Sequence, residues 1–122
     1  MMPFAPQFDG VYQAIKNACG SDFVAQRADD IWNSSVLMQD VFDLIRSSKI
    51  IICDFTSKNP NVFYEAGIAH TLGKIVIPIS QSDTDIPSDL MGHRYLKYLN
   101  NQQGLDELSD KLKRKLGTYI SF

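Results

Sequence analysis

The sequence has few of the residues on which several classes of protein depend. Its 122 residues include two cysteines and two histidines. Cys19 and Cys53 are too few for a disulfide framework, and Cys53 lies in an apolar run that is typical of a buried strand. We therefore expect a reduced, cytoplasmic protein. Because the cysteines and histidines lack the spacing of metal ligands, we expect neither a metal site nor a bound cofactor.

Long apolar runs and an excess of charge of one sign are also absent. No stretch approaches the roughly 18 apolar residues of a membrane helix, and the N-terminus has no charged segment followed by an apolar one. We therefore expect no membrane partner. The net charge of −2 excludes the basic footprint of a protein that binds duplex nucleic acid. One basic cluster lies near the end of a predicted helix, and we interpret it as a solvated helix end; it comprises Lys111, Lys113, Arg114 and Lys115.

The remaining composition is ordinary for one soluble globular domain. The chain is 44% hydrophobic and 21% charged, and its length suffices for a self-sufficient core. We expect a single domain over residues 1–122.

Helical and strand-like patterns alternate along the chain. This alternation predicts an α/β fold with a mainly parallel sheet of about five strands. Asn59 and Pro60 are a favourable N-cap and first residue for the third helix. Pro78 should fall at a bulge or near the end of its strand. A first strand should precede residue 8 and must be very short or truncated. We expect helices at residues 8–19, 36–48, 59–73 and 105–116, and further strands at 22–27, 49–55, 75–79 and 94–99.

Two carboxylates mark a candidate site. Ligands of open parallel sheets bind at the carboxyl ends of the strands, where loops and helix N-termini converge. Asp54 ends the third predicted strand, and Glu65 lies early in the next helix, beside Phe63, Tyr64 and small residues. We therefore expect both carboxylates on one rim of one cleft. Carboxylate pairs cleave glycosidic bonds: one attacks the anomeric carbon, while the other handles protons or orients hydroxyls.

These polar residues also have structural explanations. Asp54 could only cap the loop after its strand, and Glu65 could only interact with a helix dipole. Arg27 follows the second predicted strand and could bind a phosphate or pair with Asp29 and Asp30. Those aspartates could instead cap the following helix. The sequence leaves these alternatives open.

Four segments carry a resemblance to a known family. The segments MMPF, FDGVYQAIK, QRADD and ICDFTSKNPNVFYEAGIAHTLGK resemble the nucleoside 2-deoxyribosyltransferase-like superfamily. More narrowly, the chain is similar to its bacterial branch, which is related to TIR-like nucleotide- and NAD-processing domains. The similarity covers nearly the whole chain, and NPNVFYEAGIAH is its most specific part. It implies a flavodoxin-like three-layer α/β sandwich and, as is usual in the family, a homo-oligomer.

The resemblance also implies roles for individual residues. Glu65 matches the nucleophile that takes the sugar from the base, and Asp54 matches an aspartate that assists at the same site. The family loop that matches Met2, Pro3 and Phe4 lines the nucleobase side. Further candidates for substrate contacts are Phe8, Arg27, Asp30, Asn61 and Tyr64.

The substrate class follows from one difference. Transferases of this family carry a Gly-Thr or Gly-Ser turn before the glutamate, where this chain has Asn59, Pro60 and Asn61. This difference favours members that act on nucleotides or NAD-like dinucleotides, or that only bind a nucleotide. We therefore expect cleavage or transfer of the N-glycosidic bond of a nucleoside, nucleotide or NAD-like molecule. The alternative is a non-catalytic nucleotide-binding sensory or assembly module of TIR-like type.

Overall fold

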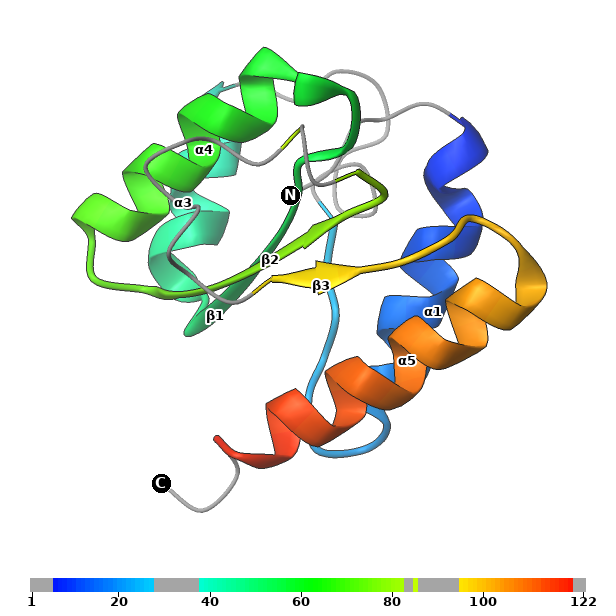
Figure 1. Ribbon diagram of the computed structural model, residues 1–122. Helices are drawn as coiled ribbons and strands as arrows, with labels where there is room; N and C mark the ends of the chain where they lie inside the picture. The colour runs from blue at the N-terminus through cyan, green and yellow to red at the C-terminus, as the bar shows by residue number, and fades with distance from the viewer. Residues whose placement is uncertain (1–5, 28–37, 83–84, 86–94, 120–122) are drawn as a thin grey trace.

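The computed structural model describes residues 6–27, 38–82, 85 and 95–119. These residues contain four α-helices and three β-strands (Figure 1), which confirms the predicted α/β class. None of the helices in this part of the chain combines the length and the apolar character of a membrane span. The elements in chain order are η1 (Pro6–Phe8), α1 (Asp9–Cys19), α3 (Met38–Ser47), β1 (Ile50–Asp54), η2 (Thr56–Lys58), α4 (Pro60–Thr71), β2 (Ile75–Ser80), β3 (Leu96–Lys97) and α5 (Gln102–Gly117), where η marks a short 3-10 helix.

The three strands form one parallel sheet in the order β1-β2-β3. Ile50 of β1 lies opposite Ile75 of β2, and Ile79 of β2 lies opposite Leu96 of β3. Successive residues of β1 contribute to opposite faces of the sheet, and both faces are covered. This explains why the sequence of β1 is continuously apolar instead of alternating.

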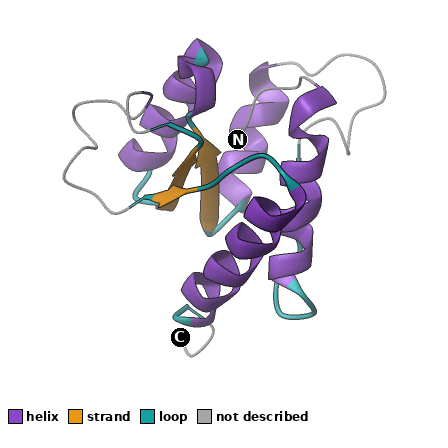
Figure 2. Cartoon of the chain, turned by 45° about the vertical axis from the view of Figure 1, so that its right-hand side comes forward, coloured by secondary structure: helices purple, strands orange, loops and turns teal. Residues whose placement is uncertain are grey.

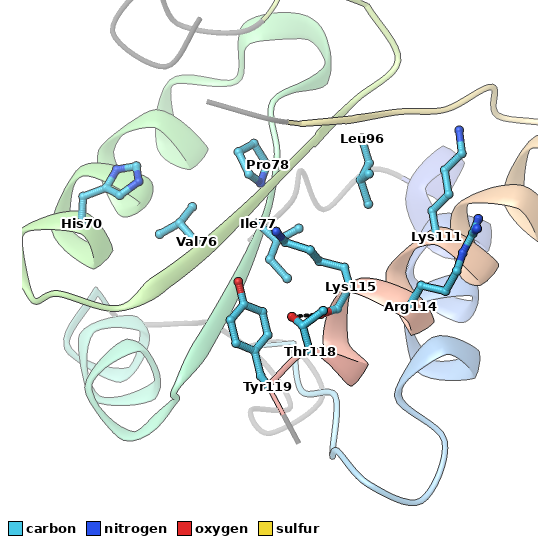
Figure 3. Close-up of a pocket in the computed structure, with 10 residues that line it drawn as sticks. All are labelled: His70, Val76, Ile77, Pro78, Leu96, Lys111, Arg114, Lys115, Thr118 and Tyr119. Atoms are coloured by element: carbon cyan, nitrogen blue, oxygen red, sulfur yellow. Dashed lines mark hydrogen bonds between the residues drawn. The ribbon is translucent and has the colours of Figure 1, made fainter. Parts of the chain in front are cut away.

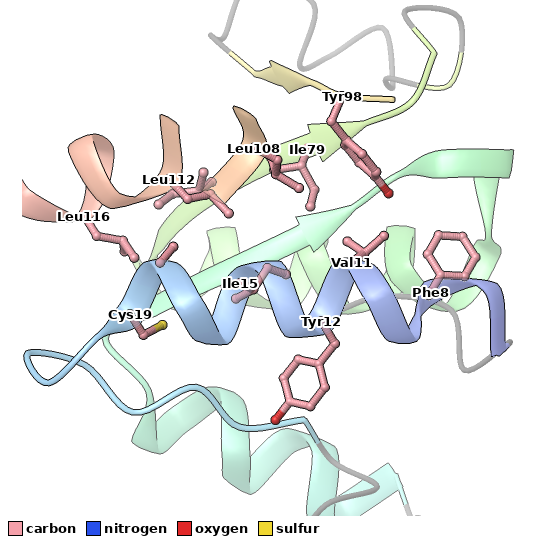
Figure 4. Packing of buried hydrophobic residues seen from close by; sticks show 12 residues of the cluster. Phe8, Val11, Tyr12, Ile15, Cys19, Ile79, Tyr98, Leu108, Leu112 and Leu116 are labelled. Atoms are coloured by element: carbon pink, nitrogen blue, oxygen red, sulfur yellow. The ribbon is translucent and has the colours of Figure 1, made fainter. Parts of the chain in front are cut away.

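Helices cover both faces of the sheet (Figures 1 and 2). On one face, α1 and α5 pack against each other and against the sheet (Figure 4). The buried residues of this α1–α5 cluster are Phe8, Val11, Tyr12, Ile15, Ala18, Cys19, Ile77, Ile79, Tyr98, Leu108, Leu112 and Leu116. On the other face, the α3–α4 cluster comprises Val41, Ile45, Ile51, Cys53, Phe55, Val62, Ala66 and Ala69.

Local signals set the ends of the helices. The side chain of Asn59 accepts hydrogen bonds from the backbone N–H groups of Asn61 at 2.9 Å and Val62 at 3.4 Å, which confirms the predicted N-cap of α4. This helix ends at Thr71, slightly before the predicted end at residue 73. Gly73 follows with a φ of 72°, a left-handed conformation that glycine adopts at low cost.

The prediction of a strand at residues 22–27 is wrong. The structure gives residues 23–27 no strand assignment. Phe23 and Ala25 pack against the α1–α5 cluster, whereas Val24 is 85% exposed. These side chains therefore alternate between core and solvent, although the segment does not join the sheet. The described residues contain three strands instead of about five, and the short first strand expected at residues 1–4 lies outside them.

Pro78 lies inside β2 in continuous register, near the end of the strand and without a bulge. The carbonyl of Ser80 accepts a hydrogen bond from the backbone N–H of Tyr98 at 3.1 Å, so it faces β3. Pro78 is two residues away, and its nitrogen therefore faces the same side. Because β3 begins at Leu96, opposite Ile79, the proline removes no hydrogen bond from the described β2–β3 ladder.

Candidate functional site

The carboxyl ends of the strands meet at one edge of the sheet, where Asp54 is the last residue of β1. Its side chain is 0% exposed. Oδ1 accepts hydrogen bonds from the backbone N–H of Thr56 at 3.0 Å and from its Oγ1 at 2.6 Å, and Oδ2 accepts one from the Tyr98 hydroxyl. Protein groups therefore supply the hydrogen bonds that a buried carboxylate needs.

Gln81 extends this network so that it joins all three strand ends. Its backbone N–H donates to Thr56 Oγ1 at 3.0 Å, and its side-chain Nε2 donates to the Tyr98 hydroxyl oxygen at 3.1 Å. Gln81 directly follows β2, and Tyr98 directly follows β3. Asp54 thus holds the ends of the three strands together, in addition to any part in chemistry.

The protonation states of Asp54 and Tyr98 are coupled. Burial raises the pKa of the Asp54 carboxyl, while hydrogen bonds from Thr56 and Tyr98 act in the opposite direction. Burial also raises the pKa of the Tyr98 phenol, and the charge of Asp54 raises it further. The phenol therefore stays protonated at neutral pH and remains a donor to Asp54.

Glu65 lies in the second turn of α4 and is half-buried. At about 100° per residue, it is about 60° around the helix from Val62 and about 40° from Ala69. Both of these residues are buried against the sheet. Glu65 therefore lies at the edge of the buried stripe, which explains its apolar surroundings. Burial raises the pKa of its carboxyl.

The expectation that Asp54 and Glu65 share one rim of one cleft is not met in the described residues, because the two carboxylates belong to opposite faces of the sheet. Asp54 bonds to Tyr98 of the α1–α5 cluster, whereas Glu65 belongs to α4, which covers the other face. Burial, together with the charges of Glu65 and Asp54, raises the pKa of the Cys53 thiol to about 11.

The loop between β1 and α4 is strained. Ser57 and Lys58 have φ angles of 65° and 53°, in the left-handed region, although neither is glycine. This conformation costs about 1–2 kcal/mol per residue. The backbone N–H of Ser57 donates to Asp85 Oδ2 at 2.8 Å, a contact that helps to hold the loop. Strain of this kind is often found at functional sites, and here it lies between the two carboxylates in the sequence.

Two predicted substrate contacts lie against α1 instead of the end of β1. Phe8 is 3% exposed and belongs to the α1–α5 cluster (Figure 4). The guanidinium carbon of Arg27 lies 4.4 Å from the centroid of the Tyr12 ring, and its Nη1 is 3.7 Å from Asp9 Oδ1. Both side chains are therefore engaged in packing or pairing within this structure.

Two other predicted substrate contacts, Asn61 and Tyr64, are near Glu65 in the sequence but lie on the exposed side of α4. Asn61 is exposed and donates its backbone N–H to the cap residue Asn59. Tyr64 is 57% exposed, and its ring centroid lies 6.5 Å from that of Phe42. The remaining predicted contacts lie outside the described residues; they are Met2, Pro3, Phe4 and Asp30.

The network around Asp54 contains residues that sequence reasoning missed. Aspartate side chains in turns often accept a hydrogen bond from the backbone two residues later. This tendency could have identified Thr56 as a partner of Asp54 from the sequence. Tyr98 is separated from Asp54 by 44 positions, so no local pattern reveals their contact.

No protein-family model, no curated protein and no solved structure matches this chain. Within the described residues, no three His, Cys, Asp or Glu side chains are grouped as ligands of one metal ion would be.

Proposed function

We propose that the protein cleaves or transfers the N-glycosidic bond of a nucleoside, nucleotide or NAD-like molecule, with Glu65 as the nucleophile. The observation that carries this proposal is the half-buried carboxyl of Glu65 at the edge of the buried stripe of α4, the α-helix that follows β1 in the chain. The resemblance of NPNVFYEAGIAH to nucleoside 2-deoxyribosyltransferase-like proteins supports the same role. We also propose a flavodoxin-like arrangement, with which the parallel strands and the two helical layers are compatible.

The proposed reaction has two displacement steps. A carboxylate oxygen of Glu65 attacks the anomeric carbon, and the carbon–nitrogen bond breaks. Its electron pair passes to the base. A base that is neutral in the substrate takes up a proton from solvent, whereas the cationic nicotinamide of an NAD-like molecule leaves as a neutral base without one. Water or a second base then attacks the anomeric carbon, and the ester bond returns its electron pair to Glu65. The attacking water or base loses a proton to solvent. Partial burial makes the Glu65 carboxylate more basic, and therefore more nucleophilic, than a solvated one.

We propose a positioning role for Asp54. Its carboxylate already accepts three hydrogen bonds, two from Thr56 and one from Tyr98. It therefore supports the strand ends instead of exchanging protons with the substrate.

A chromatographic assay for free base tests the proposal. The wild type and two variants, Glu65→Gln and Glu107→Gln, are incubated with NAD, a ribonucleotide mixture and a deoxynucleotide mixture. Glu107 is the other glutamate of the chain and is exposed on α5, so it is a matched control. We expect base release by the wild type and Glu107→Gln, and a loss of about 10³-fold or more in Glu65→Gln. Equal release by a folded Glu65→Gln variant would contradict the assigned nucleophile.

The second candidate is a non-catalytic nucleotide-binding sensory or assembly module. The complete satisfaction of Asp54 by protein donors favours it, because this carboxylate has a structural use without catalysis. This candidate predicts no base release from any of the mixtures. It also predicts binding of one of the same ligands, measured by titration calorimetry, that survives Glu65→Gln.

We further propose that the protein is a cytoplasmic homo-oligomer, as is usual for the family that it resembles. Cys19 and Cys53 are free thiols and both are buried, which is compatible with a reducing compartment. Sedimentation velocity tests the oligomer, and a monomer at all accessible concentrations would contradict it.

A further inference from the structure

A cavity lies where β2 faces the last turns of α5 (Figure 3). Its volume is about 670 Å³, within the range of about 300–1,000 Å³ that is typical of small-molecule sites. We call it the α5 cavity. His70 of α4, Pro78 of β2 and Leu96 of β3 contribute to its walls, whereas neither Asp54 nor Glu65 lines it. It is therefore separate from the site proposed for the reaction.

Three cations of α5 line this cavity, namely Lys111, Arg114 and Lys115. They are three and four residues apart, so they share one face of the helix. Within the described part of the chain, none of them has a carboxylate partner within 4.0 Å. Like charges at this spacing repel one another, and a bound anion would relieve that repulsion.

The other walls of the α5 cavity are apolar and aromatic. Figure 3 shows that the side chains of Tyr119 and Lys115 extend toward Ile77 of β2. Nζ of Lys115 lies 6.0 Å from the centroid of the Tyr119 ring. Apolar walls with a few convergent polar groups are typical of sites for small organic ligands. A ligand with a flat ring as well as an anionic group would use both parts of this lining.

A solvated helix end does not account for this arrangement. The helix dipole favours cations near the end of α5, but it does not direct them toward an aromatic concavity. The fourth cation, Lys113, lies on a different side of the helix, beside Cys19 and Leu116. The remaining three line the α5 cavity.

We propose that the α5 cavity binds a small phosphate monoester that carries a flat organic group. The phosphate lies against Lys111, Arg114 and Lys115, and the flat group lies against Tyr119. A phosphate monoester carries a charge of about −1.5 to −2 at neutral pH, which three cations can balance. The inference does not depend on the reaction proposed for Glu65.

An NMR titration of the full chain with 1-naphthyl phosphate tests this proposal. This probe has no N-glycosidic bond, so the proposed reaction cannot consume it, and its binding can be assessed whether or not that reaction occurs. We expect saturable shifts of the backbone amides of Lys111 and Tyr119. Arg114→Gln should weaken binding by about tenfold, because it removes one charge-assisted contact. Lys113→Gln removes the same charge outside the cavity and should change the affinity by less than about twofold.

Titrations with 1-naphthol and with inorganic phosphate separate the two parts of the ligand. Each should bind at least about tenfold more weakly than the ester, since each lacks one set of contacts. Absence of saturable shifts at Lys111 and Tyr119 would overturn the proposal. Equal weakening by Arg114→Gln and Lys113→Gln would do the same, because it would indicate general charge attraction. Binding of either fragment as tight as that of the ester would show that the ligand class is wrong.

Discussion

The charged side chains at the carboxyl end of the sheet and those that line the α5 cavity differ in burial and in pairing. Asp54 is fully buried, and Thr56 and Tyr98 supply three hydrogen bonds to its carboxylate. Lys111 and Arg114 are exposed and have no carboxylate partner among the described residues. A buried charge is costly unless the protein pairs it, whereas water solvates an exposed one. We therefore expect that replacing Asp54 or its partners lowers the free energy of unfolding, whereas replacing the cations of the α5 cavity changes it little.

Glu65 lies between these two extremes. It is half-buried, and this burial raises the pKa of its carboxyl. Such a residue lowers the stability of the fold when it is ionised. The hydrogen bonds to Asp54, in contrast, hold the strand ends together. This division between a supporting carboxylate and a destabilised one fits the roles proposed for Asp54 and Glu65.

The largest effect on stability is expected from Asp54→Ala. The substitution leaves the buried Tyr98 hydroxyl and the Thr56 donors without their acceptor, so the free energy of unfolding should fall by about 3 kcal/mol. Urea denaturation measures this loss. Asp110→Ala removes an exposed carboxylate of α5 and should have little effect. If the two variants lose the same stability, the Asp54 network does not support the fold as described.

A smaller loss is expected from Tyr98→Phe. The hydroxyl donates to Asp54 and accepts from Gln81, so its removal should cost about 1.5 kcal/mol of unfolding free energy. The buried ring itself is retained, which separates the hydrogen bonds from packing. Tyr64→Phe is the matched control, because Tyr64 is 57% exposed. Unchanged stability in Tyr98→Phe would mean that the contact between β1 and β3 is energetically neutral.

Glu65→Gln should change the pH dependence of stability. Burial raises the pKa of Glu65 in the folded state above its ordinary value of 4.5, so the native state binds more protons than the unfolded state between the two values. The stability of the wild type therefore falls as the pH rises through that window, and Glu65→Gln lacks this loss. Relative to the wild type, the variant should be more stable at about pH 7 than at about pH 4.

Thermal unfolding at the two pH values measures this difference, with Glu107→Gln as the control. Glu107 is exposed, so its variant should differ from the wild type equally at both pH values. A Glu65→Gln variant that gains no relative stability on raising the pH would contradict the burial of this carboxyl.

The helices could be predicted from the sequence because their signals are local. The cap formed by Asn59 and the leucine stripe of α5 each lie within one helix. The error at residues 22–27 has the opposite cause. Phe23 and Ala25 alternate with exposed Val24 as in a strand, but pairing with a neighbouring strand depends on distant residues.

In the candidate site, too, the local features could be predicted from the sequence and the long-range contacts could not. The positions of Asp54 and Glu65 follow from the end of one strand and the start of the next helix, both of which are local features. Tyr98 and the α5 cavity were not predictable, because each depends on contacts between elements far apart in the sequence. The sequence shows that the end of α5 is rich in cations, but it does not show that three of these cations line a cavity.

Removal of cations from the α5 cavity should have the smallest effect on stability. Arg114→Gln loses a favourable interaction with the helix dipole and also relieves repulsion from Lys111, so the unfolding free energy should change by less than about 0.5 kcal/mol. Thermal unfolding without ligand measures this change. With 1-naphthyl phosphate present, the wild type should gain more thermal stability than Arg114→Gln, because ligand binding favours the native state. A loss without ligand as large as that of Asp54→Ala would show that Arg114 supports the fold, and the contrast between the carboxyl end of the sheet and the α5 cavity would then be wrong.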